Sequence, residues 1–247
     1  MKRAFVLSVL LLLMVGCGST PKFSRENGER TKGFVLREME SVGKTRKYSV
    51  FVPHTPPPPG GYPVILAMHG LGEGGGDGKG PTKVGIGPVI NKQQESFDFL
   101  VVFPQIGGMV NWNNDRSARI AIDALDNAMR DFNGNPDRVI ATGYSNGGQG
   151  AWVVGGKYPD RFAGLVPMCA YSATEYVPQL KNLPIWVWHN SLDWAVSNGH
   201  SDRMVKELRR AGANVKYTQP SSASHDVWVN AFKDQNLYAW MKQQRRR

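Results

Sequence analysis

A five-residue segment at 143–147, with the sequence Gly-Tyr-Ser-Asn-Gly, constrains the fold of this chain more than any other part of it. It follows a short apolar run at 138–142 and precedes a predicted helix at 148–158. A strand, a G-x-S-x-G turn and a helix in this order form a nucleophile elbow, in which the residues around the serine must be small. The turn would expose the hydroxyl of Ser145, and the helix N-terminus would point N–H groups toward a reacting carbonyl.

The motif alone is weak evidence because the chain is rich in glycine. With 28 glycines in 247 residues, chance would supply roughly 0.2 such pentapeptides. Three further features, however, stand where an elbow predicts them.

The first feature lies upstream of the motif. Residues 62–68 form a continuous apolar run, typical of a parallel strand covered on both faces, and His69 and Gly70 come directly after it. The backbone N–H of Leu71 would then join that of Asn146 in an oxyanion hole, where each donor contributes about 3 kcal/mol. The alternative is a glycine-rich surface loop, since glycine and charged residues dominate the segment at 73–80.

The other two features lie downstream. Asp193 comes shortly after a second buried-strand pattern, at 184–190, and could accept a hydrogen bond from a histidine Nδ1. The alternative for Asp193 is a turn cap. His225 follows a predicted strand at 215–219 and completes the order Ser, Asp, His. We therefore expect Ser145, Asp193 and His225 to form a catalytic triad.

With these residues in place, the chain resembles the α/β-hydrolase superfamily. Within it, the chain is similar to bacterial esterases related to feruloyl and acetyl-xylan esterases, poly(hydroxybutyrate) depolymerases and dienelactone hydrolases. The resemblance runs from about residue 35 to residue 240, and its matching segments are 62–72, 99–105, 137–152, 158–167, 183–193 and 211–228. Two positions depart from the family pattern: Asn146 stands where Met is frequent, and Asn190 where Gly is frequent. We expect the Asn146 side chain to change the polarity of the pocket.

The resemblance and the alternation of patterns predict an α/β-hydrolase fold without a large lid. The sheet would be doubly wound and mostly parallel, with about eight strands and helices on both faces. We expect strands near residues 34–40, 46–53, 63–68, 99–103, 138–142, 164–170, 185–189 and 215–219. Besides the helix after the elbow, we expect helices at 117–132, 201–211 and 228–242.

The N-terminus is predicted to be a targeting segment. Residues 1–16 combine a basic start with an apolar run, as an export signal does. Residues 13–17 resemble a bacterial lipobox, which would lipidate Cys17 and leave 17–32 as a tether for a catalytic domain at 33–247. The alternative is an ordinary secretory signal with an incidental cysteine. We therefore expect an exported protein, anchored as a lipoprotein of the bacterial envelope.

Composition argues against several other classes. The net charge is +10, but the basic residues are scattered except at 245–247, which favours a solubilising surface over a nucleic-acid site. Cys169 is the one other cysteine and is expected to be a small buried apolar residue. The sequence has no Cys/His cluster with metal-ligand spacing and no phosphate-binding loop. The chemistry expected of the triad requires no metal and no cofactor.

The substrate is predicted less directly. Trp112, Trp194 and Trp228 lie near the predicted catalytic loops and could form a platform for an aromatic acyl group or a sugar ring. Core packing is the alternative for each of them. The resemblance implies a feruloyl or acetyl ester of a polysaccharide, or a polyester oligomer. Two other functions stay open: a peptidase of the same fold and a catalytically silent surface binding protein.

Overall fold

The structure is a computed structural model, and it describes residue 21 and residues 32–246. The predicted signal segment, the lipidation site Cys17 and nearly all of the tether lie outside the described residues. Within the part that is described, no helix is both long and apolar enough to cross a membrane.

The centre of the molecule is an eight-stranded sheet with the strand order β1-β2-β4-β3-β5-β6-β7-β8. β1 and β2 form an antiparallel hairpin, and β2 pairs antiparallel with β4. All pairs from β4 through β8 are parallel. The strands are β1 (Gly33–Ser41), β2 (Lys44–Val52), β3 (Tyr62–Met68), β4 (Leu100–Phe103), β5 (Gly134–Tyr144), β6 (Gly164–Met168), β7 (Ile185–Trp188) and β8 (Val215–Thr218). The prediction of a mostly parallel sheet of about eight strands is confirmed.

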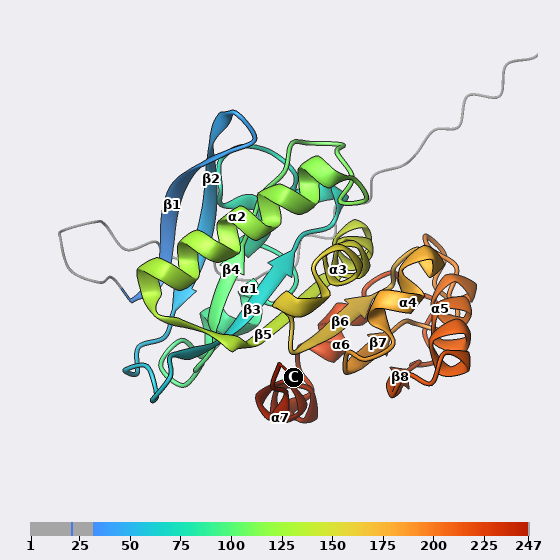
Figure 1. The fold of residues 1–247 in the computed structure, drawn as a ribbon. Helices are drawn as coiled ribbons and strands as arrows, with labels where there is room; N and C mark the ends of the chain where they lie inside the picture. Colours follow the sequence, from blue (N-terminus) through green and yellow to red (C-terminus); the bar gives the residue numbers. More distant parts are fainter. Residues whose placement is uncertain (1–20, 22–31, 247) are drawn as a thin grey trace, which may run out of the picture.

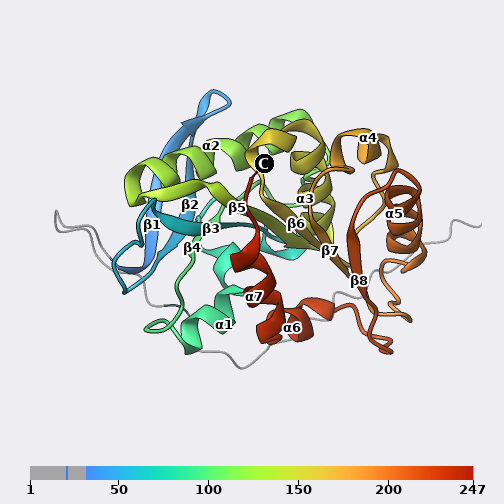
Figure 2. The same cartoon turned by 60° about the horizontal axis from the view of Figure 1, so that its bottom comes forward.

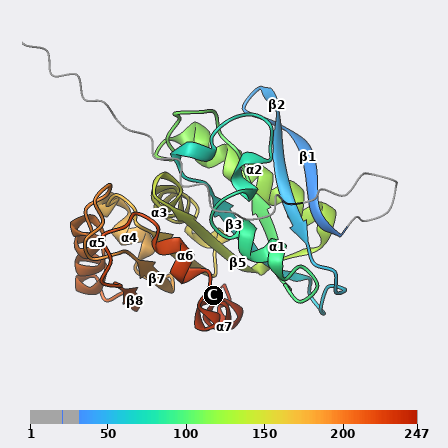
Figure 3. The same cartoon turned by 180° about the vertical axis from the view of Figure 1, so that it is seen from behind.

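Helices cover both faces of the sheet, as expected for a doubly wound arrangement (Figures 1, 2 and 3). One face carries α2 (Asp115–Phe132), α3 (Asn146–Lys157), α4 (Val177–Leu180) and α5 (Gly199–Arg210). The other face carries α1 (Gly87–Lys92), α6 (Val227–Ala231) and α7 (Gln235–Gln243). Each face has its own cluster of buried apolar side chains, so the sheet separates two hydrophobic cores.

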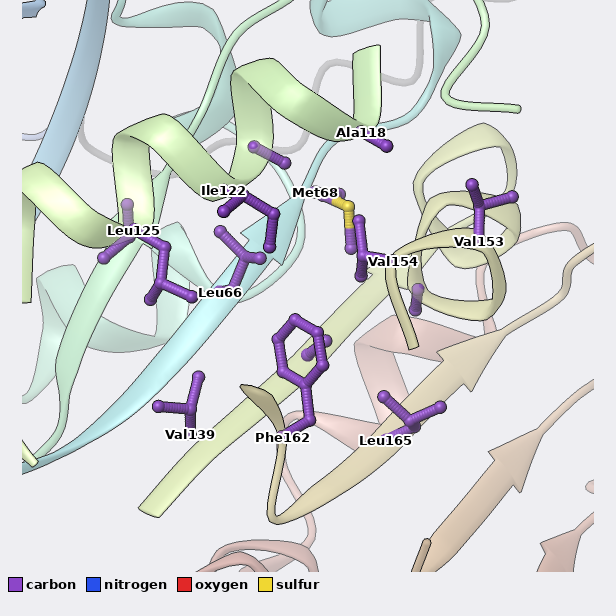
Figure 4. Close-up of a cluster of buried hydrophobic side chains, with 14 of the residues drawn as sticks. Leu66, Met68, Ala118, Ile122, Leu125, Val139, Val153, Val154, Phe162 and Leu165 are labelled. Atoms are coloured by element: carbon purple, nitrogen blue, oxygen red, sulfur yellow. The ribbon is translucent and has the colours of Figure 1, made fainter. Parts of the chain in front are cut away.

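The core beneath α2 and α3 shows how the sequence pattern becomes packing. Leu66 and Met68 of β3 point into the space between these helices, where Ile122 and Val154 meet them (Figure 4). The side chain of Asn114 caps the start of α2 by accepting a hydrogen bond of 2.9 Å from the N–H of Ser117. This packing holds β3 and β5 side by side, and part of the candidate site lies at the ends of those two strands.

The predicted helix at 228–242 is instead two helices, α6 and α7. The side chain of Asp234 accepts a hydrogen bond of 2.9 Å from the N–H of Asn236 and so caps a new helix start. The chain can turn there, and both short helices pack on the sheet face that also carries α1 (Figure 2).

Candidate active site

Residue Ser145 sits in a strained turn between β5 and α3. Its φ of 54° and ψ of −122° are unusual for a residue with a side chain. A Cβ added to Gly143 would lie 2.3 Å from the carbonyl oxygen of Gly147, and one added to Gly147 would lie 2.1 Å from that of Met68. Both glycines are thus required by close backbone contacts. The local geometry is that of a nucleophile elbow.

The two predicted oxyanion donors lie at the starts of two helical segments. Asn146 is the first residue of α3, and Leu71 is the first residue of a short 3₁₀ turn, Leu71–Glu73, just after β3. The close approach of Gly147 to the end of β3 brings these two segments together. Among the described residues, neither backbone N–H has a hydrogen-bond partner. Both donors are therefore free to bind a developing negative charge.

A buried histidine, His69, supports the turn that carries Leu71. Its Nε2 accepts a hydrogen bond of 3.2 Å from the N–H of Ile106, which leaves the proton on Nδ1, and Nδ1 donates to the carbonyl of Gly70. Burial lowers the pKa of His69 to about 4, although the bond to Gly70 acts in the opposite direction. His69 is thus neutral at pH 7, and its ring links the backbone of Ile106 to that of Gly70 through hydrogen bonds.

The side chain of Asn146 fixes the loop that follows β4. Its Oδ1 accepts a hydrogen bond of 3.1 Å from the N–H of Trp112, and its Nδ2 donates one of 3.0 Å to the carbonyl of Val110. The residue is buried. The expectation that this side chain changes the polarity of the pocket is therefore wrong, because both ends of the amide are engaged with backbone.

The acid and the base of the predicted triad are in direct contact. Nδ1 of His225 lies 2.7 Å from Oδ2 of Asp193. Oδ1 of Asp193 accepts hydrogen bonds of 2.9 Å from the N–H of Ala195 and 3.0 Å from that of Val196. Burial raises the pKa of Asp193, but hydrogen bonds from His189, His225 and Val196 outweigh it and hold that pKa well below its usual range. The carboxylate is consequently ionised at pH 7 and fixes the orientation of His225.

Cys169, directly after β6, lies between the elbow and this pair. The N–H of Ser145 donates a hydrogen bond of 2.9 Å to the carbonyl of Met168, and the sulfur of the next residue, Cys169, lies within 4.8 Å of ligand atoms of Asp193 and His225. In the described part of the chain, the Ser145 hydroxyl itself has no hydrogen-bond partner. Such catalytic contacts are often long without substrate and tighten in the complex.

Cys169 is fully buried, and burial strongly raises the pKa of its thiol. It is therefore a neutral apolar residue, as expected from the sequence. Cys169, Asp193 and His225 form the one cluster within the described residues whose atoms could hold a metal ion. The protonated thiol and the direct bond between the other two favour acid–base chemistry over metal binding.

Two of the three predicted platform tryptophans lie beside the histidine. The ring centroid of Trp228 is 5.7 Å from that of His225, and the centroid of Trp194 is 6.4 Å from it. Trp194 is 76% exposed. Trp112, by contrast, is 0% exposed, and its Nε1 donates to the carbonyl of His69 at 3.0 Å. The expectation for Trp112 is corrected: it belongs to the core under the oxyanion turn and offers no surface to a substrate.

Sequence reasoning missed a second link across the oxyanion side. The hydroxyl of Tyr144 donates a hydrogen bond of 2.8 Å to Oε2 of Glu73. Burial raises the pKa of Glu73, and burial together with the nearby carboxylate raises that of Tyr144. The bond ties the loop after β3 to the residue before the nucleophile. No signal marked Glu73, because it opens a stretch dominated by glycine and charged residues.

The comparison with known sequences gives one distant relative, and no protein-family model matches the chain. An uncharacterized secreted protein of the fungus Arthroderma benhamiae is 28% identical over 209 residues. The match covers 66% of this chain and 21% of the fungal protein, so the chain spans about a fifth of that relative.

Solved structures match over most of the chain. A thermostable esterase superposes with a TM-score of 0.75 at 24% identity, covering 86% of this chain and 63% of the esterase chain. A ferulic acid esterase gives 0.64 at 18% identity, covering 84% and 96%. The acylaminoacyl peptidase of Pyrococcus horikoshii gives 0.66 at 14% identity, covering 87% and 42%. This chain thus spans less than two thirds of the thermostable esterase, and at these identities the likeness shows the fold.

Proposed function

Because the chain has the α/β-hydrolase fold, we propose that it is a serine hydrolase that cleaves carboxylic esters. One observation carries the proposal: a histidine bonded to a buried carboxylate lies at the same sheet edge as a serine held in an elbow. In this arrangement Ser145 is the nucleophile, His225 is the general base and Asp193 orients the base.

The proposed reaction proceeds through an acyl-enzyme. The Ser145 oxygen attacks the ester carbonyl while Nε2 of His225 takes the hydroxyl proton. The backbone N–H groups of Leu71 and Asn146 stabilise the oxyanion of the tetrahedral intermediate. The bond to the alcohol oxygen then breaks, and the alcohol leaves with the proton from His225. Water, activated by the same histidine, attacks the acyl-enzyme, releases the acid and regenerates Ser145.

The proposed substrate is a feruloyl or acetyl ester of a polysaccharide, or a polyester oligomer. Trp194 and Trp228 support this proposal because their rings flank His225, where an aromatic acyl group or a sugar ring could stack. The structural match to a ferulic acid esterase points in the same direction.

We further propose that the protein is exported and anchored through a lipid on Cys17. The apolar run and lipobox-like residues near the N-terminus support this, as does the relative described as secreted. The anchor would hold the enzyme at the bacterial envelope, in the periplasm or at the cell surface, with the segment at 17–32 as its tether.

A peptidase is the second candidate, because the acylaminoacyl peptidase shares the fold. The same triad could attack an amide, so the substrate decides between the two. A catalytically silent binding protein has less support, since each predicted triad residue is present and Asp193 and His225 are bonded.

The experiment compares turnover of p-nitrophenyl acetate, p-nitrophenyl butyrate, methyl ferulate and an acetylated aminoacyl p-nitroanilide, using protein without residues 1–17. Ester hydrolysis that disappears in Ser145→Ala is the expected result. Cleavage of the anilide alone would favour the peptidase. No turnover above the Ser145→Ala control on any substrate would overturn the proposed hydrolase.

A further inference from the structure

The carboxamide of Asn190 joins the two loops that carry the acid and the base. Asn190 is fully buried, two residues after the end of β7. Its Nδ2 donates a hydrogen bond of 2.8 Å to the carbonyl oxygen of Ser224, and it has longer contacts of 3.3 Å to Oγ of Ser224 and 3.4 Å to Oδ1 of Asp226. These acceptors directly precede and follow His225 in the chain.

Backbone pairing between the two loops ends before His225 is reached. The N–H of Ser191 donates to the carbonyl of Pro220 at 2.9 Å, and that of Leu192 donates to the carbonyl of Ser222 at 3.1 Å. Beyond Ser222, the hydrogen bonds that side chains of the acid loop make to the histidine loop, among the residues that the structure describes, are the Asp193–His225 bond and those of the Asn190 amide. The Asn190 amide thus fixes the backbone that carries the base.

Only one end of this amide is used. Oδ1 of Asn190 is buried, and in the described part of the chain no group donates a hydrogen bond to it. A buried acceptor left without a partner lowers the stability of the fold. Stability alone therefore does not explain an amide at this position. The donor end does have a role, because it binds the carbonyl of Ser224.

We propose that Asn190 is a positioning residue, which keeps His225 in register with Asp193 by holding the carbonyl of Ser224. This inference rests on the proposed function, in which His225 is the base. Among the described residues, no hydrogen bond joins the Asn190 side chain to that of Ser145, Asp193 or His225. It acts through the backbone of the histidine loop, where a shift of about 1 Å can lower the rate on the order of 10²-fold.

The test compares Asn190→Ala and Asn190→Asp with Ser41→Ala. The aspartate keeps the volume of asparagine but has no donor. Ser41 is a matched control, because it is buried on β1, far from the site, and donates a hydrogen bond of 2.7 Å to Asp123. Two readouts are needed: steady-state kinetics on p-nitrophenyl acetate, and the downfield NMR signal of the Nδ1 proton between His225 and Asp193, which requires no substrate.

Both Asn190 variants should lower kcat by 10- to 100-fold with KM within about twofold, and both should broaden or remove the proton signal. Ser41→Ala should keep kcat and the signal whatever its effect on stability. Retention of kcat in Asn190→Asp would overturn the proposal, because it would show that volume matters and the donor does not. An unchanged proton signal in both variants would also overturn it. A wild-type protein without turnover defeats the proposed esterase, and the NMR signal then still decides the role of Asn190.

Discussion

The elbow side of the site, at the ends of β3 and β5, is built mainly from backbone, whereas the acid–base side, after β7 and β8, is built from side chains. On the elbow side, close approaches of Gly143 and Gly147 to carbonyl oxygens fix Ser145. On the acid–base side, the amide of Asn190 and the carboxylate of Asp193 hold His225. Substitutions on the two sides should therefore have different effects. On the elbow side a steric clash should destabilise the fold. On the acid–base side the loss of a hydrogen bond should lower the activity of a protein that stays folded.

The largest expected effect is on the acid–base side. Asp193→Asn keeps the shape of the side chain but removes the charge that, in the proposed mechanism, fixes the tautomer of His225. We expect kcat to fall about 10⁴-fold, equivalent to about 5 kcal/mol of transition-state stabilisation. Steady-state kinetics measures kcat, and circular dichroism checks that the variant is folded. A variant that is folded and within tenfold of wild type would show that Asp193 does not orient the base.

A substitution on the elbow side should instead damage the fold. Gly147→Ala places a Cβ 2.1 Å from the carbonyl oxygen of Met68, so the start of α3 must move away from β3. We expect a loss of about 3 kcal/mol or more in the free energy of unfolding, together with loss of turnover. Urea unfolding checks the first quantity. Gly72→Ala is the control, because a Cβ at Gly72 meets no atom within 4 Å. Equal stability of the two variants would contradict the steric account of the elbow.

The third expected effect is on the pH dependence of stability, to which the two sides should contribute in different pH ranges. The pKa of His69 is lowered from 6.5 to about 4, so the folded state favours the neutral ring. Its contribution to stability is fully present above pH 6.5 and is lost as the pH falls toward 4, by up to about 3 kcal/mol. The pKa of Asp193 is also lowered, and the stability that this contributes is lost only when the pH falls below the ordinary value of 3.8.

Urea unfolding at pH 7 and pH 4.5 tests this prediction on wild type and His69→Gln. The variant should lose part of the acid sensitivity, because glutamine does not titrate. The same pH dependence in both proteins would show that His69 does not carry the effect.

The smallest expected effect comes from the exposed rim. Trp194→Ala removes a ring that is 76% exposed, so the free energy of unfolding should change by less than about 0.5 kcal/mol. The KM for methyl ferulate should rise several-fold while that for p-nitrophenyl acetate stays the same, if the ring stacks on an aromatic acyl group. Equal changes in KM for both esters would argue against stacking. Trp112→Ala is the contrast, because truncation of this buried ring should cost about 3–5 kcal/mol.

Sequence reasoning reached the features that depend on local backbone pattern more completely than those that depend on long-range side-chain contacts. Apolar runs and glycine spacing predicted the eight strands and the strand–turn–helix around Ser145, because these depend on local pattern. The roles of Asn190 and Asn146 could not be read from the sequence, because their partners lie 34 and 36 positions away. Trp112 was misplaced for the same reason: its proximity to the site in sequence did not reveal that its ring lies under the oxyanion turn.

The central claim is that Ser145 is a nucleophile activated by His225. Reaction with a fluorophosphonate probe, followed by peptide mass spectrometry, tests it most directly and needs no knowledge of the natural ester. The account predicts one adduct per chain, on Ser145, with labelling strongly reduced in His225→Ala. No adduct in the wild-type protein, an adduct on another residue, or equal labelling in His225→Ala would contradict it.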